Sequence, residues 1–157
     1  MTVDDALQGT IAQDVAGVVG DFVLKRGDGI YAYQLACVVD DLEMGITEVV
    51  RGADLLGSAP RQVLLAELLG GTPSGFAHVP PVVSADGSRL AKRARGVSLR
   101  DHRETGVAPA KVIAALARVV DLPPRDTPRD LLRDFDRERL TGVREVRIAG
   151  ETVDFGV

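Results

Sequence analysis

The sequence predicts an α/β fold in which strands and helices alternate over the first half and helices dominate the second. Two apolar stretches with helical spacing, 33–44 and 59–69, flank a β-branched stretch at 46–50. Beyond residue 98, apolar residues recur at helical intervals after proline and threonine start signals. With 157 residues, the chain is long enough for a domain with a buried core.

The first elements follow from local composition. The apolar stretch 18–25 predicts a strand, the Asp-Gly pair at 28–29 predicts a hairpin turn, and 30–33 returns from that turn. A helix is expected over 33–44, because it lacks glycine and proline and is followed by a glycine that suits a helix end.

The next elements alternate in type. The β-branched residues of 46–50 predict a buried strand. A helix is expected over 59–69, with Pro60 in its first turn and two glycines after it. Residues 76–83 are expected to be extended, and the proline pair at 80–81 argues against a central position in a sheet.

The remaining elements are mainly helical. A short helix is expected over 98–104, and a stronger one over 108–120 with Pro109 in its first turn. Thr127 is the expected N-cap of another helix, because Pro128 suits the first helical position. Residues 145–155 predict a small terminal hairpin.

Composition excludes several classes of protein. No apolar run approaches the roughly 20 residues that span a membrane, and the first residues lack the basic and apolar regions of a signal peptide. Cys37 is the only cysteine, which excludes an intrachain disulfide and a cysteine zinc site. Aromatic residues make up 4%, too few for a stacking surface that binds single-stranded nucleic acid. We therefore expect a cytoplasmic protein without membrane contact.

Charge is distributed unevenly along the chain. Residues 1–88 contain 4 basic and 12 acidic residues, whereas 89–147 contain 15 basic and 9 acidic residues. The basic second part suggests contact with a polyanion. Because the charges there often alternate in sign, an ordinary solvated helical surface remains an alternative.

One predicted helix face gathers groups that suit a small zwitterion. Tyr33, Cys37 and Asp40 share a face at helical spacing, with Asp41 beside them. Arg51, near the end of the next strand, could bind a carboxylate in a bidentate manner, while a phenol and a carboxylate hold an ammonium group. The alternative is an internal Asp–Arg pair that braces the helix against the strand.

A basic loop follows the predicted turn at 86–87. It contains Arg89, Leu90, Ala91, Lys92 and Arg93. A lysine among arginines could neutralise charge on transferring phosphates, and the alternative is a solvated loop. The two histidines, His78 and His102, lack metal-ligand spacing, so we interpret both as structural or surface residues and expect no metal site.

These residues lie within a longer recognisable pattern. Residues 20–70 read GDFVLKRGDGIYAYQLACVVDDLEMGITEVVRGADLLGSAPRQVLLAELLG, and residues 78–93 read HVPPVVSADGSRLAKR. In order and spacing over roughly 1–140, the chain resembles class I glutamyl-tRNA synthetase catalytic domains, especially the glutamyl-Q tRNA(Asp) synthetase branch. The resemblance implies the C-terminal half of a Rossmann-type catalytic domain over 1–88, a KMSKS-like loop over 89–97, and a helical stem-contact region over 98–157.

The resemblance also implies an activity. Members of that branch use ATP, with Mg, to activate L-glutamate as glutamyl-adenylate, and they transfer it to the queuosine base of tRNA(Asp). Tyr33 and Arg51 match the family's glutamate-binding residues, and Cys37, Asp40 and Asp41 are candidate supporting residues. The loop 89–93 matches the family's nucleotide-binding loop, which makes Lys92 the expected catalytic contact to ATP.

Three departures from the family pattern follow. Arg89 and Ala91 stand where the loop usually has lysine and serine. The family's first half, with its HIGH-type motif and, in many members, a zinc site, has no counterpart in residues 1–30. We therefore expect a truncated chain or a separate polypeptide that supplies this half. The alternatives are a fragment of an ordinary glutamyl-tRNA synthetase and a non-catalytic remnant that binds tRNA or protein.

Overall fold

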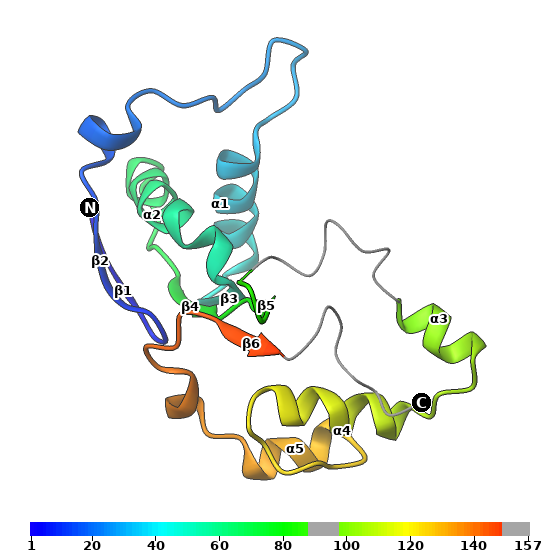
Figure 1. The fold of residues 1–157 in the computed structure, drawn as a ribbon. Coiled ribbons are helices and arrows are strands. Elements are labelled where there is room, and N and C mark those ends of the chain that lie inside the picture. Colours follow the sequence, from blue (N-terminus) through cyan, green and yellow to red (C-terminus); the bar gives the residue numbers. More distant parts are fainter. Residues whose placement is uncertain (88–97, 149–157) are drawn as a thin grey trace. The chain divides into compact units, whose positions relative to one another are not determined.

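The computed structural model describes residues 1–87 and 98–148. These residues form two compact units (Figure 1). The first unit comprises Met1–Val79 and Leu140–Gly142, and the second comprises the described parts of Pro80–Arg139 and Val143–Val157. Among the described residues, no helix is long and apolar enough to cross a membrane.

The first unit contains a four-stranded sheet. Its strands run in the order β2-β1-β4-β3. β1 pairs with β2 in antiparallel fashion, whereas β1 with β4 and β4 with β3 are parallel pairs. The bounds are β1 Thr2–Asp5, β2 Gly9–Ala12, β3 Glu48–Gly52 and β4 Gly75–Val79.

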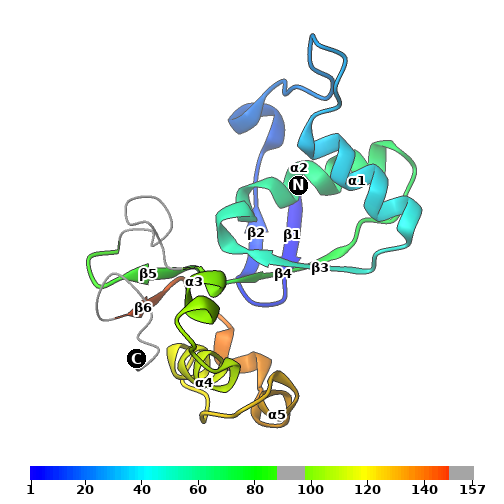
Figure 2. The ribbon, with the colours of Figure 1, turned by 90° about the vertical axis from the view of Figure 1, so that its right-hand side faces the viewer.

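Two helices, α1 (Tyr33–Met44) and α2 (Ala59–Leu68), lie side by side in the first unit (Figures 1 and 2). α2 supplies the apolar contact with the sheet, where Ala59, Val63, Val3 and Phe76 form one buried cluster. A second cluster, between α1 and α2, contains Val38, Leu65 and Ala66. Two short helical turns, η1 (Val15–Val19) and η2 (Ala53–Ser58), precede α1 and α2 respectively.

The second unit contains helices and a two-stranded sheet. The parallel strands β5 (Val82–Ser84) and β6 (Val146–Ile148) pair with each other. A capping box between Ser98 and Asp101 starts α3, and the Thr127 side chain accepts a hydrogen bond from the Asp130 backbone at the start of α5. The helical bounds are α3 Leu99–Glu104, α4 Pro109–Val119, α5 Pro128–Asp134 and η3 Arg137–Leu140.

The predicted helices are confirmed. They could be predicted because the signals that start and stop a helix lie within its own sequence. α1 occupies the predicted residues 33–44, and Gly45 ends it with a φ of 67°. α2, α3, α4 and α5 lie within one or two residues of their predicted bounds. The hairpin formed by β1 and β2 was not predicted from the sequence.

The predicted strand at 18–25 is wrong. The turn η1 ends at Val19, and Gly20 follows with a φ of 66°. In the part of the chain that the structure describes, the strand pairing of this segment is limited to an isolated antiparallel bridge between Lys25 and Tyr31, across the turn predicted at 28–29. Val18 and Val23 are exposed by 71% and 61%, so the apolar residues that suggested a strand are not buried against a sheet.

Two sheet positions also differ from expectation. β3 begins at Glu48 rather than at residue 46. It is only partly buried, because it has one neighbouring strand in the described sheet, and its Val50 side chain is 63% exposed. The proline pair at 80–81 argued against a central position, but β4 is central and ends at Val79, just before the prolines.

The predicted terminal hairpin is tested only in its first arm, where β6 forms a strand over Val146–Ile148. Within the described residues, β6 pairs in parallel with β5, a pairing that was not predicted. Pairing between distant segments depends on the tertiary fold, so it has no local sequence signal. The expected second arm, from residue 149 onward, lies outside the described residues.

Candidate functional site

The carboxyl ends of three parallel strands bring together an acid, a histidine and an arginine. Asp5 is the last residue of β1, and Arg51 and His78 are the penultimate residues of β3 and β4. Arg51 and His78 are direct partners in the strand register. In open α/β sheets, ligands bind outside the carboxyl ends of the strands. This edge of the sheet is therefore the candidate site.

The three side chains form a continuous chain of hydrogen bonds. His78 Nδ1 lies 2.5 Å from Asp5 Oδ2, and Arg51 Nε donates to His78 Nε2 at 2.9 Å. An arginine side chain has donors only, so Nε2 must be the unprotonated nitrogen. His78 is therefore a neutral imidazole that carries its hydrogen on Nδ1 and donates it to Asp5.

Asp5 is held as a carboxylate by converging donors. Its Oδ1 accepts backbone hydrogen bonds from Leu7 at 3.0 Å, Gln8 at 2.8 Å and His78 at 3.1 Å. Burial by itself raises the pKa of this carboxyl, but hydrogen bonds from the His78 side chain and from the three backbone groups hold the pKa below its usual value of 3.8. The group therefore stays ionised at neutral pH.

Arg51 is held in place by two further contacts. Its guanidinium carbon lies 5.1 Å from the centre of the Phe76 ring, and its Nη2 donates a long hydrogen bond of 3.4 Å to the Leu55 carbonyl. The same Phe76 ring stacks on His78 at a centroid distance of 5.8 Å. Among the described residues, Nη1 has no hydrogen-bond partner. The guanidinium thus keeps donors for a carboxylate.

The predicted α1 face makes no hydrogen bond or ion pair with Arg51 among the described residues. Tyr33 is the first residue of α1 and is 49% exposed, Cys37 is partly buried, and Asp40 is exposed. No ion pair among the described residues joins Arg51 to Asp40 or Asp41, so the alternative interpretation, an internal Asp–Arg pair that braces the helix, is wrong. The acid that Arg51 reaches, through His78, is Asp5.

The short turn η2 links the start of α1 to Arg51. Gln34, next to Tyr33, donates to the Ser58 hydroxyl at 3.0 Å, and Leu55 in the same turn accepts from Arg51. Ser58 is buried, which fixes the turn against α1. Tyr33 and Arg51 are therefore linked through this turn, with no hydrogen bond between them among the described residues.

The predicted nucleotide-binding loop lies outside the described residues. This holds for Arg89, Leu90, Ala91, Lys92 and Arg93, so their roles remain predictions. The predicted turn before them is present, because Gly87 has a φ of 80° and donates to the Ser84 carbonyl at 2.9 Å. Within residues 1–87 and 98–148, no three His, Cys, Asp or Glu side chains gather as a metal site.

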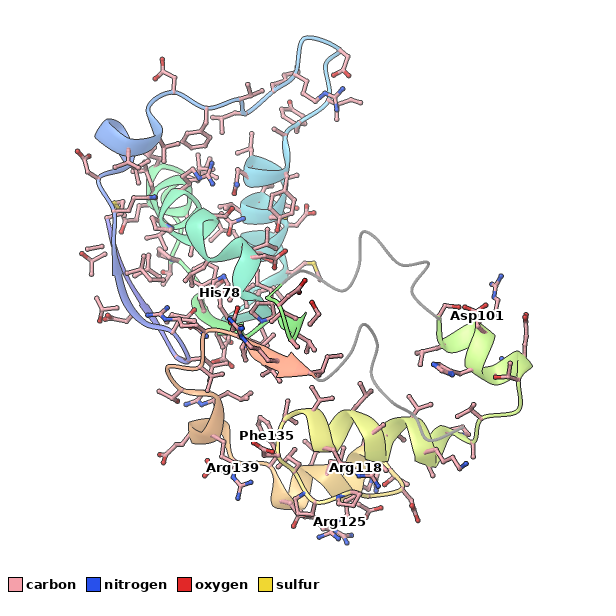
Figure 3. The ribbon with its side chains drawn as sticks, in the orientation of Figure 1. His78, Asp101, Arg118, Arg125, Phe135 and Arg139 are labelled. Atoms are coloured by element: carbon pink, nitrogen blue, oxygen red, sulfur yellow. The ribbon has the colours of Figure 1, made fainter. Side chains whose placement is uncertain are left out.

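Sequence reasoning missed Asp5 and gave His78 only a structural or surface role. Figure 3 labels His78, the penultimate residue of β4. This residue is fully buried and lies at the centre of the hydrogen-bonded chain. A histidine inside the apolar run 76–79 was the only available signal. No spacing rule could connect it to Asp5, because the two are 73 residues apart.

Comparisons with known proteins agree with one another. Residues 1–129 match the family of class I tRNA synthetases (E and Q), catalytic domain. The chain is 54% identical over 124 residues to a glutamyl-Q tRNA(Asp) synthetase of Nocardia farcinica. The aligned region covers 79% of this chain and 40% of that protein. It is 52% identical over 122 residues to the Deinococcus radiodurans protein of the same name, with 77% and 41% covered.

Solved structures show the same fold. The crystal structure of glutamate-tRNA synthetase from Elizabethkingia anophelis aligns with a TM-score of 0.79 at 25% identity. The alignment covers 96% of this chain and 34% of that one. The chain thus spans about two fifths of the length of these two curated relatives and a third of this structure.

Proposed function

The chain belongs to the class I tRNA synthetases (E and Q), catalytic domain, and on this premise we propose that it serves the ATP-dependent activation of glutamate and its transfer to the queuosine base of tRNA(Asp). The choice of glutamate and tRNA(Asp) is supported by the names of its curated relatives. Mg is expected to accompany the ATP.

The observation that carries the proposal is the anchored guanidinium of Arg51. It lies at the carboxyl ends of parallel strands, with Nε committed to His78 and the terminal nitrogens left with free hydrogens. A planar guanidinium with two parallel N–H groups matches a carboxylate. Tyr33 is proposed to contribute its hydroxyl from the start of α1, with Cys37, Asp40 and Asp41 as supporting residues on that helix.

The chemistry requires the two carboxylates of glutamate to act differently. A carboxylate paired with a guanidinium is a weak nucleophile, so Arg51 is expected to hold the side-chain carboxylate and leave the α-carboxylate to react. An oxygen of the α-carboxylate attacks the α-phosphorus of ATP, and pyrophosphate leaves with the electrons of the broken P–O bond. Lys92 is proposed to neutralise the charge on the phosphates, flanked by Arg89 and Arg93.

The second unit is proposed to contact the tRNA. Arg118 on α4 and Arg129 on α5 are exposed, and neither makes an ion pair with a described residue. By contrast, Arg125 is paired with Asp134 at 2.6 Å. Arg118, Arg125 and Arg139 lie around the α4–α5 pair (Figure 3). Arginines without acidic partners are free to neutralise phosphates.

Glutamate-dependent exchange between ATP and pyrophosphate tests the proposal. The purified chain, without tRNA, is expected to catalyse exchange that Arg51→Ala and Lys92→Ala each abolish, because one removes the glutamate anchor and the other the phosphate contact. Arg26→Ala is the matched control, since Arg26 is exposed and its side chain pairs, among the described residues, only with Asp28.

Two results would contradict the proposal. The first is exchange that survives both substitutions. The second is no exchange from a wild-type chain whose fold is confirmed by circular dichroism. In that second case, salt-dependent tRNA binding would favour the non-catalytic alternative instead.

A further inference from the structure

We infer that Asp5 and His78 are positioning residues that orient Arg51 for the side-chain carboxylate of glutamate. The inference rests on the proposed function, because it assigns the ligand of Arg51. Neither residue touches the substrate in this scheme. Asp5 sets the tautomer of His78, and His78 sets the plane of the guanidinium.

The proton arrangement in this chain has one consistent form. Arg51 Nε–H donates to His78 Nε2, so Nδ1–H must donate to Asp5 Oδ2. In the other tautomer, Nε2–H would face Nε–H, and two donors would oppose each other. The carboxylate of Asp5 therefore determines whether His78 can accept from Arg51.

Packing prevents the groups from rearranging. His78 is 0% exposed and Asp5 is 5% exposed, so water does not replace their contacts. The Phe76 ring stacks on His78 and also lies under the guanidinium of Arg51. The backbone oxygen of His78 accepts from the Gln8 side chain at 3.0 Å, which ties the end of β4 to the loop after β1. The guanidinium is thus oriented before any ligand arrives.

Asp5→Asn tests the tautomer. The amide oxygen must stay at the Oδ1 position, where it accepts from the backbones of Leu7, Gln8 and His78. The amide nitrogen then takes the Oδ2 position and donates to Nδ1, which forces the hydrogen onto Nε2. Glutamate affinity is expected to fall by roughly tenfold or more, because a hydrogen bond to a charged group is removed and replaced by opposed donors.

Two substitutions of His78 separate positioning from packing. An asparagine amide can reach the place of Nδ1 and keep Asp5 satisfied, but it leaves Arg51 Nε without an acceptor. A glutamine oxygen can reach the place of Nε2 and accept from Arg51. His78→Asn is therefore expected to raise the KM for glutamate roughly tenfold or more, while His78→Gln restores most of the affinity. The KM for ATP is expected to stay unchanged in both.

Nitrogen NMR of the wild-type chain provides a readout that does not depend on the variants folding. It is expected to show His78 as the neutral Nδ1–H tautomer and a coupling through the hydrogen bond between Arg51 Nε and His78 Nε2. Titration with L-glutamate should shift the Arg51 Nη signals while this coupling persists. Detection of the Nε2–H tautomer, or absence of the coupling, would overturn the inference.

The outcomes distinguish the inference from the proposed function. If the wild-type chain binds L-glutamate and a folded His78→Asn binds it equally well, the positioning role is wrong and the proposed function stands. If the folded wild-type chain does not bind L-glutamate, both are wrong. A third outcome is that His78→Asn and His78→Gln raise the KM for glutamate equally and also raise the KM for ATP. That result would indicate a structural role for His78 and overturn the inference.

Discussion

Asp5 lies at the end of β1, where three backbone N–H groups and the His78 ring converge on its carboxylate. Its neighbour Asp4 points to the opposite side of the strand and is exposed, as alternation along a strand requires. The two acids are adjacent in sequence, yet only one is desolvated. Burial therefore decides which of them stabilises the fold.

Asp5→Ala is expected to lower the free energy of unfolding by about 3 kcal/mol, because it leaves buried donors without an acceptor. Asp4→Ala is the matched control, since the Asp4 side chain accepts a single exposed hydrogen bond from Thr10 at 2.7 Å. The control is expected to change stability by less than about 1 kcal/mol. Urea unfolding at neutral pH measures both, and equal effects would contradict the assignment.

The same pair of variants has a predicted dependence on pH. The pKa of Asp5 is lowered in the folded protein, so its stabilising contribution is full above the unfolded value and disappears as the pH falls below 3.8 through the folded value. The stability difference between wild type and Asp5→Ala should therefore shrink in this acidic range. A difference that grows on acidification would show that the carboxyl is held in its neutral form.

At the level of elements, helices and strands were predicted with different success. The helix α1 ends where Gly45 adopts a left-handed conformation, and the Ile46 backbone then donates to the Asp41 carbonyl at 2.9 Å. These contacts join residues a few positions apart, so the sequence alone indicates them. The strand predicted at 18–25 has no comparable local signal, because a strand forms only with a partner strand and the sequence does not identify that partner.

Gly45→Ala tests this helix end. It is expected to lower the free energy of unfolding by about 1 kcal/mol, because a left-handed φ of 67° is costly for any residue with a Cβ. Gly57→Ala is the control, since Gly57 has no positive φ and a Cβ there would meet nothing within 4 Å. Thermal unfolding of the two variants gives the comparison, and a neutral Gly45→Ala would contradict the capping argument.

At the level of the whole molecule, the α/β class predicted from the sequence is confirmed by the likeness to a class I synthetase structure. The family resemblance is confirmed as well, because the matched region covers residues 1–129. Two functions are thereby proposed for two units. Glutamate recognition is proposed for the sheet of the first unit, and tRNA contact for the helices of the second.

The tRNA proposal predicts a dependence on salt. The double variant Arg118→Gln with Arg129→Gln is expected to weaken tRNA binding. In a plot of the logarithm of the binding constant against the logarithm of the salt concentration, the steepness of the slope is expected to fall by about 0.7–0.9 for each phosphate that the variant no longer neutralises. Glutamate-dependent exchange without tRNA should be unaffected. The control is Arg26→Gln in the first unit, and an unchanged slope in the double variant would contradict this assignment.

The sequence by itself determined the helices, the turns at glycine, the family, and the residues Tyr33, Arg51 and Lys92 as candidates. These features depend on contacts within a few residues or on a long continuous pattern. Only the tertiary structure brought Asp5, His78 and Arg51 together, because parallel strands align segments that are far apart in the chain. Hydrogen bonds within this buried cluster then fixed the charge of Asp5 and the tautomer of His78, and neither property can be read from residue order.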